Sequence, residues 1–210
     1  MITVIDSGIC NLASVTTALE RIGVRWSLGN TPEEIGAAVA LILPGVGAFA
    51  DGMQSLRLRG LVEPIRSYAA SGRPILGICL GMQMLADQSE EFGNHEGLGL
   101  ISGQVRRLPS LPGFRVPNIG WCNVHVTPGA RLLDNQKEET SRTFYFVHSY
   151  YYECANPDDA SAWLEIGRNR FAVALERNMI FGTQFHPEKS QEAGLEVLAR
   201  FADLVKPDHD

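Results

Sequence analysis

Short apolar runs and stretches with helical spacing alternate along the first 90 residues of the chain. Apolar runs typical of buried strands occupy residues 1–5, 25–28, 39–43 and 74–78. Between and after them, apolar side chains three or four positions apart predict helices over residues 12–22, over 61–70 and from residue 80 onward. Strands that alternate with helices in this way predict a mostly parallel sheet covered on both faces.

The second half of the chain has a different pattern, in which short apolar segments follow one another without long helices between them. We expect partly antiparallel strands around Val105 and Val124 and over residues 144–147, 172–175 and 179–185, and a closing helix over 195–205. The predicted fold class is therefore α/β, a mostly parallel central sheet flanked by helices with an additional antiparallel β portion. No repeat or linker divides residues 1–210, so we expect one domain.

Composition and charge argue against several classes of protein. Hydrophobic residues make up 45% of the chain and charged residues 20%, which is typical of a globular rather than a disordered protein. The net charge of −6 argues against a nucleic-acid-binding surface. No apolar run is long enough to cross a bilayer, and no basic targeting segment opens the chain. We therefore expect a cytoplasmic protein that binds neither nucleic acid nor membrane.

The four cysteines, Cys10, Cys79, Cys122 and Cys154, lie far apart in the sequence. They form no Cys-x-x-Cys pair, so their spacing predicts neither a zinc site nor a disulfide framework. The histidines outside the segments described below also lack ligand-like spacing, and the chain has no P-loop or dinucleotide-binding fingerprint. We expect no metal and no cofactor.

Cys79 is the one cysteine whose surroundings indicate reactivity. It lies in the segment Gly77-Ile78-Cys79-Leu80-Gly81, where a predicted strand passes into a predicted helix. Small residues on both sides allow the sharp turn of a nucleophile elbow, which exposes the reactive side chain above the sheet edge. The start of a helix favours the thiolate, and the peptide N–H of Leu80 is placed to donate to a developing oxyanion. The alternative interpretation is a packed cysteine between two turn glycines.

A second segment, Gln184-Phe185-His186-Pro187-Glu188, ends an apolar run. Pro187 favours an extended backbone at His186, and residues two apart in extended chain point to the same side. His186 and Glu188 would then project together, as in sites where a carboxylate orients the base that activates a nucleophile. A surface histidine beside a solvated glutamate is the alternative, and the cysteine elbow makes it less favourable.

A third segment, Leu43-Pro44-Gly45-Val46-Gly47, is a strand end that runs into a glycine-rich turn. Glycines permit unusual backbone angles and close approach to a ligand, so a peptide N–H here could complete an oxyanion hole with that of Leu80. A plain turn is an equally good interpretation of this segment alone.

Together the three segments resemble the class I, triad-type glutamine amidotransferases. The resemblance extends from about Ile2 to Val205 and is carried by Gly-Ile-Cys79-Leu-Gly-Met-Gln83 and Phe-His186-Pro-Glu188. Within that family the chain is most similar to the glutaminase subunits of imidazole glycerol phosphate synthase, of histidine biosynthesis. Residues 6–12, 44–49, 117–121 and 144–150 carry this closer similarity.

The resemblance implies a role for each matching position. Cys79 would attack the side-chain amide of L-glutamine and form a γ-glutamyl thioester, His186 would carry protons, and Glu188 would orient the imidazole. The implied substrate-binding residues are Gly45, Val46, Leu80, Gln83, Glu91, His148, Ser149 and Tyr150, of which Gly45 and Val46 correspond to an oxyanion strand that rearranges when the partner binds its own substrate. Asn11, Asn118, Trp121 and Lys189 would face the partner protein.

The implied partner is the (β/α)-barrel cyclase subunit, joined in a heterodimer. It would combine the ammonia with a phosphoribosyl aminoimidazole precursor, giving imidazole glycerol phosphate and an aminoimidazole carboxamide ribotide (AICAR). The chain shows no synthase domain of its own, which also places the ammonia acceptor on another polypeptide. Two positions depart from the family pattern, which usually has His or Gln at Asn118 and Asn at Cys122. Both departures bear on the interface rather than on glutamine hydrolysis.

Three other functions remain open at this level. A paralogous subunit serving amino-sugar synthesis for a surface polysaccharide would have nearly the same glutaminase, and only its partner would differ. A cysteine hydrolase acting on γ-glutamyl substrates could use the same triad, although Gln83, Glu91 and the Ser149-Tyr150 pair suit a free amino acid. A non-catalytic module that kept the fold is disfavoured because all three triad residues are present.

Overall fold

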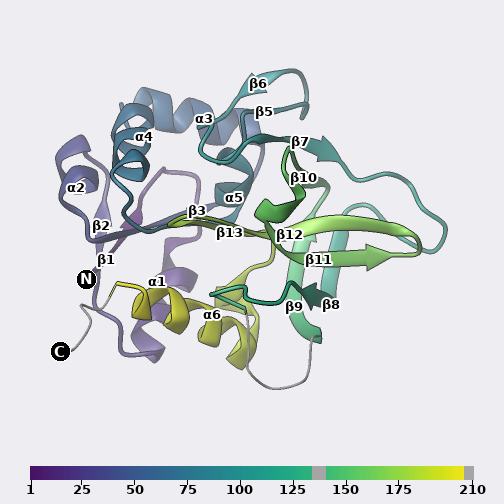
Figure 1. Ribbon diagram of the computed structural model, residues 1–210. Coiled ribbons are helices and arrows are strands. Elements are labelled where there is room, and N and C mark those ends of the chain that lie inside the picture. The colour runs from purple at the N-terminus through teal and green to yellow at the C-terminus, as the bar shows by residue number, and fades with distance from the viewer. Residues whose placement is uncertain (134–140, 206–210) are drawn as a thin grey trace.

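The computed structural model describes residues 1–133 and 141–205 and has an α/β architecture (Figure 1). Its described strands join in one thirteen-stranded sheet. The first part of this sheet has the order β2-β1-β3-β4-β13, and each of these neighbouring pairs is parallel. The bounds of these strands are β1 Ile2–Ile5, β2 Trp26–Gly29, β3 Ala40–Gly45, β4 Ile75–Cys79 and β13 Ile180–Thr183.

Helices cover both faces of the parallel strands, as the alternating pattern predicts. Two of them, α1 and α6, lie on one face, and α2, α3, α4 and α5 lie on the other (Figure 1). Their bounds are α1 Leu12–Arg21, α2 Pro32–Ala37, α3 Phe49–Leu58, α4 Val62–Ala70, α5 Leu80–Met84 and α6 Gln191–Asp203. Each face has its own core of buried apolar side chains, which leaves the strand ends as the place for polar groups. No helix within the described ranges is long and apolar enough to span a membrane.

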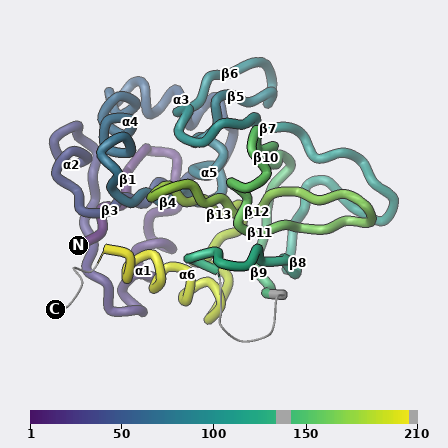
Figure 2. Tube along the Cα trace, viewed as in Figure 1, coloured from purple at the N-terminus to yellow at the C-terminus, as the bar shows by residue number. Residues whose placement is uncertain are grey.

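Strands that are antiparallel except for the parallel pair of β5 and β7 extend the sheet beyond β13. The path continues as β12-β10-β7-β5-β6, while β11 pairs with β12 and β8, and β8 pairs with β9. Strands β8, β9, β11 and β12 lie at the end of the molecule opposite β2 (Figure 2). The bounds are β5 Gln88–Ser89, β6 His95–Glu96, β7 Gly103–Arg107, β8 Asn118–Val126, β9 Ser141–His148, β10 Tyr150–Cys154, β11 Ala160–Ile166 and β12 Asn169–Arg177, with short 3₁₀ helices at Pro157–Asp159 and Pro187–Lys189. The predicted fold class, including its antiparallel portion, is confirmed.

The first predicted helix begins and ends where its cap residues indicate. The Asn11 side chain accepts a hydrogen bond from the N–H of Ser14 at 3.4 Å, and Gly23 follows the helix with a positive φ of 70°. Two helices were absent from the prediction. Helix α2 carries a complete capping box between Thr31 and Glu34, which is a visible signal. Helix α3 begins after Ala48, whose own side chain makes no capping hydrogen bond, so no comparable local signal marks it.

Tyr68 of α4 ties this helix to the amino ends of two central strands. Its hydroxyl lies 3.0 Å from the carbonyl oxygen of Val39, just before β3, and 3.1 Å from that of Pro74, just before β4. The ring is almost fully buried, and burial raises the pKa of Tyr68 to about 12. The hydroxyl therefore stays protonated and serves as a hydrogen-bond donor.

We expect Tyr68→Phe to lower the free energy of unfolding by about 1–2 kcal/mol, because buried carbonyl oxygens lose their donor. Urea denaturation followed by circular dichroism measures this change. Tyr151→Phe is the control, since no hydrogen bond of the Tyr151 hydroxyl to a described residue is found, and its ring packs edge-on to Phe171. Equal stabilities of the two variants would contradict the role given to Tyr68.

Candidate active site

The three sequence segments that indicate chemistry meet at one edge of the sheet. Strands β3, β4 and β13 are parallel neighbours, so their carboxyl ends lie side by side. Cys79 is the last residue of β4, Gly45 is the last residue of β3 and pairs with Cys79, and His186 follows β13 by a few residues. The carboxyl edge of such a sheet is the usual place for a ligand site in α/β proteins. Topology therefore brings together residues that lie far apart in the sequence.

Cys79 adopts a strained backbone conformation at the junction of β4 and α5. Its φ of 54° and ψ of −108° are rarely populated by residues other than glycine. The turn is so tight that a Cβ atom at Gly81 would lie 1.8 Å from the carbonyl oxygen of Leu43, and one at Gly77 would lie 2.7 Å from the backbone of Gly81. The predicted elbow is thus present, and both glycines are sterically required. Helix α5 ends at Met84, so the groups available to an anion at Cys79 are the local amides of one short turn.

His186 and Glu188 form a buried pair beside this turn. Nδ1 of His186 lies 2.7 Å from Oε1 of Glu188, and both side chains are 3% exposed. The prediction that the pair projects from one extended segment is wrong for Glu188. His186 itself is extended, but Pro187 begins a 3₁₀ helix that contains Glu188, because its fixed φ suits a first helical position. The two side chains meet across this turn.

The charge state of His186 depends on its two neighbours. Burial disfavours the imidazolium, but the side chains of Cys79 and Glu188 outweigh this effect and raise the pKa of His186 to about 9. Nε2 of His186 is buried and makes no hydrogen bond within normal distance to a described residue. This nitrogen, on the ring edge away from Glu188, is the atom available to exchange a proton.

A cleft of about 320 Å³ opens over Cys79 and His186. Seven of the eight predicted substrate-binding residues line it, and Gly45 does not, because it packs against Leu80 and Gly81 behind the cleft wall. The lining comprises Val46, Gly47, Cys79, Leu80, Gln83, Glu91, Pro117, Val147, His148, Ser149, Tyr150 and His186. The sequence interpretation did not include Gly47 as a lining residue, nor Pro117 and Val147.

The peptide N–H of Val46 does not point into this cleft. It donates a hydrogen bond to the carbonyl oxygen of Ile9 at 3.2 Å. The N–H of Leu80, the first residue of α5, has no acceptor within the helix. In this conformation Leu80 offers the oxyanion-type donor expected of it, whereas Val46 would have to leave Ile9 to do the same.

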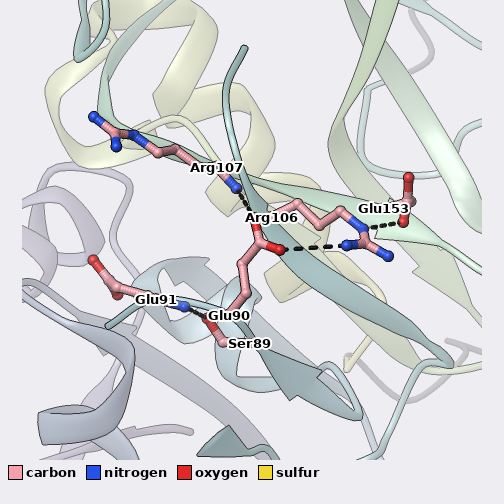
Figure 3. A network of polar contacts seen from close by, with 6 residues as sticks. All are labelled: Ser89, Glu90, Glu91, Arg106, Arg107 and Glu153. Carbon is pink, nitrogen blue, oxygen red and sulfur yellow. Dashed lines mark hydrogen bonds and ion pairs between the residues drawn. The ribbon is translucent and has the colours of Figure 1, made fainter. Parts of the chain in front are cut away.

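The segment that carries Glu91 is held in place by hydrogen bonds of Glu90 and of the Glu91 N–H. Glu90 accepts hydrogen bonds from the Arg107 N–H and the Arg106 side chain, which fastens the segment to β7, and the N–H of Glu91 donates to Ser89 (Figure 3). Figure 3 shows the side chains of Glu90 and Glu91 pointing in different directions. Oε2 of Glu91 accepts the N–H of Phe49 at 2.6 Å, so this carboxylate also caps α3.

The predicted partner-facing residues fall into two groups. Asn11 and Lys189 are exposed, and Trp121 is 48% exposed with its ring edge-on to Tyr145. Asn118 is 6% exposed and turns inward, where its Nδ2 lies 3.1 Å from Nε2 of His148. The outward position beside it belongs to Ile119, which is 61% exposed, because side chains alternate along β8.

Gln184 was not given a role by the sequence interpretation, although it stands beside His186. Its side chain is fully buried, and Nε2 donates to Sγ of Cys79 at 3.7 Å. The available signal was an uncharged amide directly after a buried strand, which requires buried hydrogen-bond partners.

His148 is the second buried imidazole of the cleft, and it is neutral. Burial lowers the pKa of His148 to about 4, its contact with the carbonyl of Tyr150 opposes that shift, and the charge of His186 adds to it. An unfolded histidine titrates near 6.5, so the unfolded chain takes up a proton first as the pH falls from about 6.5 to 4. Folding stability contributed by neutral His148 is present above this window and is lost within it.

We expect the free energy of unfolding to fall by about 2 kcal/mol between pH 7.5 and pH 5 on account of His148. The variant His148→Gln should lack this component and show a shallower pH dependence. Urea denaturation at several pH values measures the slopes. His125→Gln is the control, because that imidazole is half exposed. Equal slopes for the native chain and both variants would exclude a buried, neutral His148.

Comparison with known proteins agrees with this arrangement. Residues 3–204 match the family described as Glutamine amidotransferase class-I. The imidazole glycerol phosphate synthase subunit HisH of Moorella thermoacetica is 47% identical, covering 98% of this chain and 95% of its own length. The HisH subunit of Rhodopirellula baltica is 45% identical, covering 96% and 97%.

Solved structures support the fold independently. A crystal structure of a glutamine amidotransferase superposes with a TM-score of 0.75 at 19% identity, covering 97% of this chain and 98% of that one. At that identity the likeness concerns the fold alone. The match over residues 3–204, together with relatives more than 40% identical over nearly their full length, confirms the resemblance seen in the sequence. The chain belongs to the class I glutamine amidotransferases.

Proposed function

We propose that this protein is the glutaminase subunit of imidazole glycerol phosphate synthase, in which Cys79, His186 and Glu188 release ammonia from L-glutamine. The observation that carries the proposal is the buried His186–Glu188 contact of 2.7 Å beside a strained Cys79, all at one cleft. The relatives named as subunits of that synthase support the pathway. Ammonia from this site would serve histidine biosynthesis.

The charge on His186 sets the order of the chemical steps. A protonated imidazole beside Cys79 favours the thiolate, so Sγ attacks the amide carbon of glutamine directly. The carbonyl oxygen becomes an oxyanion, for which the N–H of Leu80 is a donor. His186 then gives its proton to the departing nitrogen, and ammonia leaves as the thioester forms. Water, deprotonated by His186, cleaves the thioester, which restores Cys79 and releases glutamate.

Glu188 acts on His186 rather than on the substrate. Its Oε1 faces Nδ1, so a proton stays on that nitrogen and Nε2 is left for transfer. The amino-acid end of glutamine would lie against Gln83, Glu91 and the segment from His148 to Tyr150, which line the cleft. Carboxylate and amide groups there suit the ammonium and carboxylate of a free amino acid.

The hydrogen bond between Val46 and Ile9 supports control of the reaction by a partner. One oxyanion donor is engaged elsewhere, so hydrolysis of glutamine by the isolated chain should be slow. A partner that moves the Gly45–Val46 segment would complete the oxyanion hole. Such coupling requires that the partner bind the rearranged conformation more tightly.

The surface around the cleft is suited to a protein partner. Val46 and Val147 line the cleft and are each 38% exposed, and Ile119 and Trp121 of β8 are more exposed still. A cluster of exposed apolar residues at a cleft typically marks an interaction site. A cyclase subunit of (β/α)-barrel fold, bound here in a heterodimer, would receive ammonia without its release to solvent.

Substitution of the triad tests the assignment. Cys79→Ser should reduce ammonia release from glutamine to background, and Glu188→Gln should reduce kcat by about a hundredfold to ten-thousandfold. Coupled glutamate dehydrogenase measures the ammonia released. Glu192→Gln is the control, because Glu192 is an exposed carboxylate on α6 paired only with Arg21. Full activity of Cys79→Ser would end the assignment.

Addition of the partner tests its proposed control. Glutaminase activity should rise about a hundredfold or more when the purified cyclase subunit and its ribonucleotide substrate are present, since one oxyanion donor is worth that much. Steady-state ammonia release with and without the cyclase measures the effect.

An interface variant distinguishes specific activation from a general effect of added protein. Trp121→Ala should raise the cyclase concentration needed for half-maximal activation. Leu58→Ala should not, because Leu58 is an exposed apolar residue of α3 that does not line the cleft. Equal rates with and without the cyclase would contradict partner control.

A further inference from the structure

A continuous series of hydrogen bonds joins strand β8 to Sγ of Cys79. It begins at Cys122, whose Sγ donates to Oδ1 of Asn118 at 3.5 Å, and Nδ2 of Asn118 lies 3.1 Å from Nε2 of His148. Nδ1 of His148 lies 2.7 Å from the carbonyl oxygen of Tyr150. These contacts include both positions at which the chain departs from the common family pattern.

The series continues through two amide side chains. The carbonyl oxygen of Tyr150 also accepts Nε2 of Gln83 at 3.2 Å, and the same Nε2 donates to Oε1 of Gln184 at 2.9 Å. Nε2 of Gln184 then donates to Sγ of Cys79 at 3.7 Å. A carbonyl oxygen has two lone pairs, so Tyr150 satisfies both of its donors.

The carbonyl oxygen of Tyr150 fixes the orientation of the groups on both of its sides. The carbonyl of Tyr150 can only accept, so the proton of neutral His148 is on Nδ1 and its Nε2 is a bare acceptor. Asn118 must therefore present its NH₂ group to His148, which leaves its oxygen for Cys122. Gln83 must donate to Tyr150 and to Gln184, so Gln184 presents its oxygen to Gln83 and its NH₂ group to Cys79. If the amide of Gln83 were rotated by half a turn, its oxygen would face the oxygens of Tyr150 and Gln184. If the amide of Gln184 were rotated, its NH₂ group would face that of Gln83.

Burial makes this orientation energetically important. Gln184 is fully buried, and Gln83, Asn118 and His148 are each 6% exposed. Buried polar groups that lose a partner are costly, so the side chains in the series hold one another in a single arrangement. Gln184 and Asn118 do not line the cleft, so neither is placed to touch the substrate.

We propose that Gln184 is a positioning residue for the nucleophile, and that Asn118, His148 and Gln83 hold its amide so that it donates to Cys79. This inference rests on the proposed role of Cys79. The donated hydrogen bond stabilises the negative charge of the thiolate and directs Sγ toward the cleft, while Nε2 of His186 remains available for proton transfer. Asn118, on the strand that faces the partner, acts at the far end of the same series.

The pH dependence of Cys79 alkylation by iodoacetamide tests the inference. Thiolate is the reactive form, so removing its donor should move the midpoint of alkylation to higher pH. Gln184→Met keeps the size of the side chain without the donor, and we expect its midpoint to rise by about one pH unit, which corresponds to a tenfold weaker acid. Asn118→Leu should shift the midpoint in the same direction by less. Mass spectrometry of the peptide containing Cys79 separates this reaction from that of the other cysteines.

Thr183→Val is the matched control, because Thr183 is a buried neighbour of Gln184 whose hydroxyl has no partner among the described residues. Its alkylation profile should match that of the native chain. Unchanged profiles in Gln184→Met and Asn118→Leu would overturn the inference, as would a shift in Gln184→Met alone. If Gln184→Met does not fold, judged by circular dichroism, the profile of Asn118→Leu decides.

The same variants distinguish failure of this inference from failure of the proposed function. Alkylation reports on Cys79 without requiring glutamine hydrolysis, and Cys79→Ser reports on hydrolysis without involving Gln184. If Cys79→Ser loses activity but the alkylation profiles of Gln184→Met and Asn118→Leu are unshifted, the proposed function stands and the positioning role of Gln184 is refuted. In the cyclase complex, Gln184→Met should lower kcat for glutamine with little change in KM, because Gln184 does not line the substrate cleft.

Discussion

The close approach of α5 to β3 is the constraint on which the site depends. Gly81 lies so near the carbonyl oxygen of Leu43 that no side chain fits between them, and Cys79, two residues earlier, adopts a strained conformation in the same turn. Strain of this kind persists only where surrounding structure holds it, and here the neighbouring parallel strands do so. Because the same strands end beside Cys79, the fold that strains this residue also places the Gly45–Val46 turn and His186 next to it.

Two buried imidazoles of the cleft carry different charges for identifiable reasons. His186 lies between Cys79 and Glu188, whose side chains favour its protonated form. Among the described residues His148 has no acidic partner, and its ring nitrogens form hydrogen bonds with the carbonyl of Tyr150 and the amide of Asn118. The charge of His186 further disfavours a proton on His148. One ring can therefore transfer protons while the other serves as a fixed, neutral hydrogen-bonding group.

Two routes would link the proposed partner surface to the proposed catalytic residues. One is the hydrogen bond of Val46 to Ile9, which withholds an oxyanion donor. The other is the polar series from Asn118 to Cys79, which orients the nucleophile. A subunit whose product is ammonia benefits from this arrangement, because hydrolysis without an acceptor wastes glutamine.

The sequence by itself determined the fold class, the elbow at Cys79, the identity of the triad candidates and the family. These features are local: strand and helix periodicities, turn glycines and short motifs are recorded in neighbouring residues. Only the tertiary structure decided that Glu188 meets His186 across a 3₁₀ turn, that Asn118 turns inward, that Val46 bonds to Ile9 and that Gln184 reaches Cys79. The first depends on a local turn that the extended pattern did not reveal, and the other three depend on contacts between segments distant in sequence, where packing rather than local pattern sets the direction of a group.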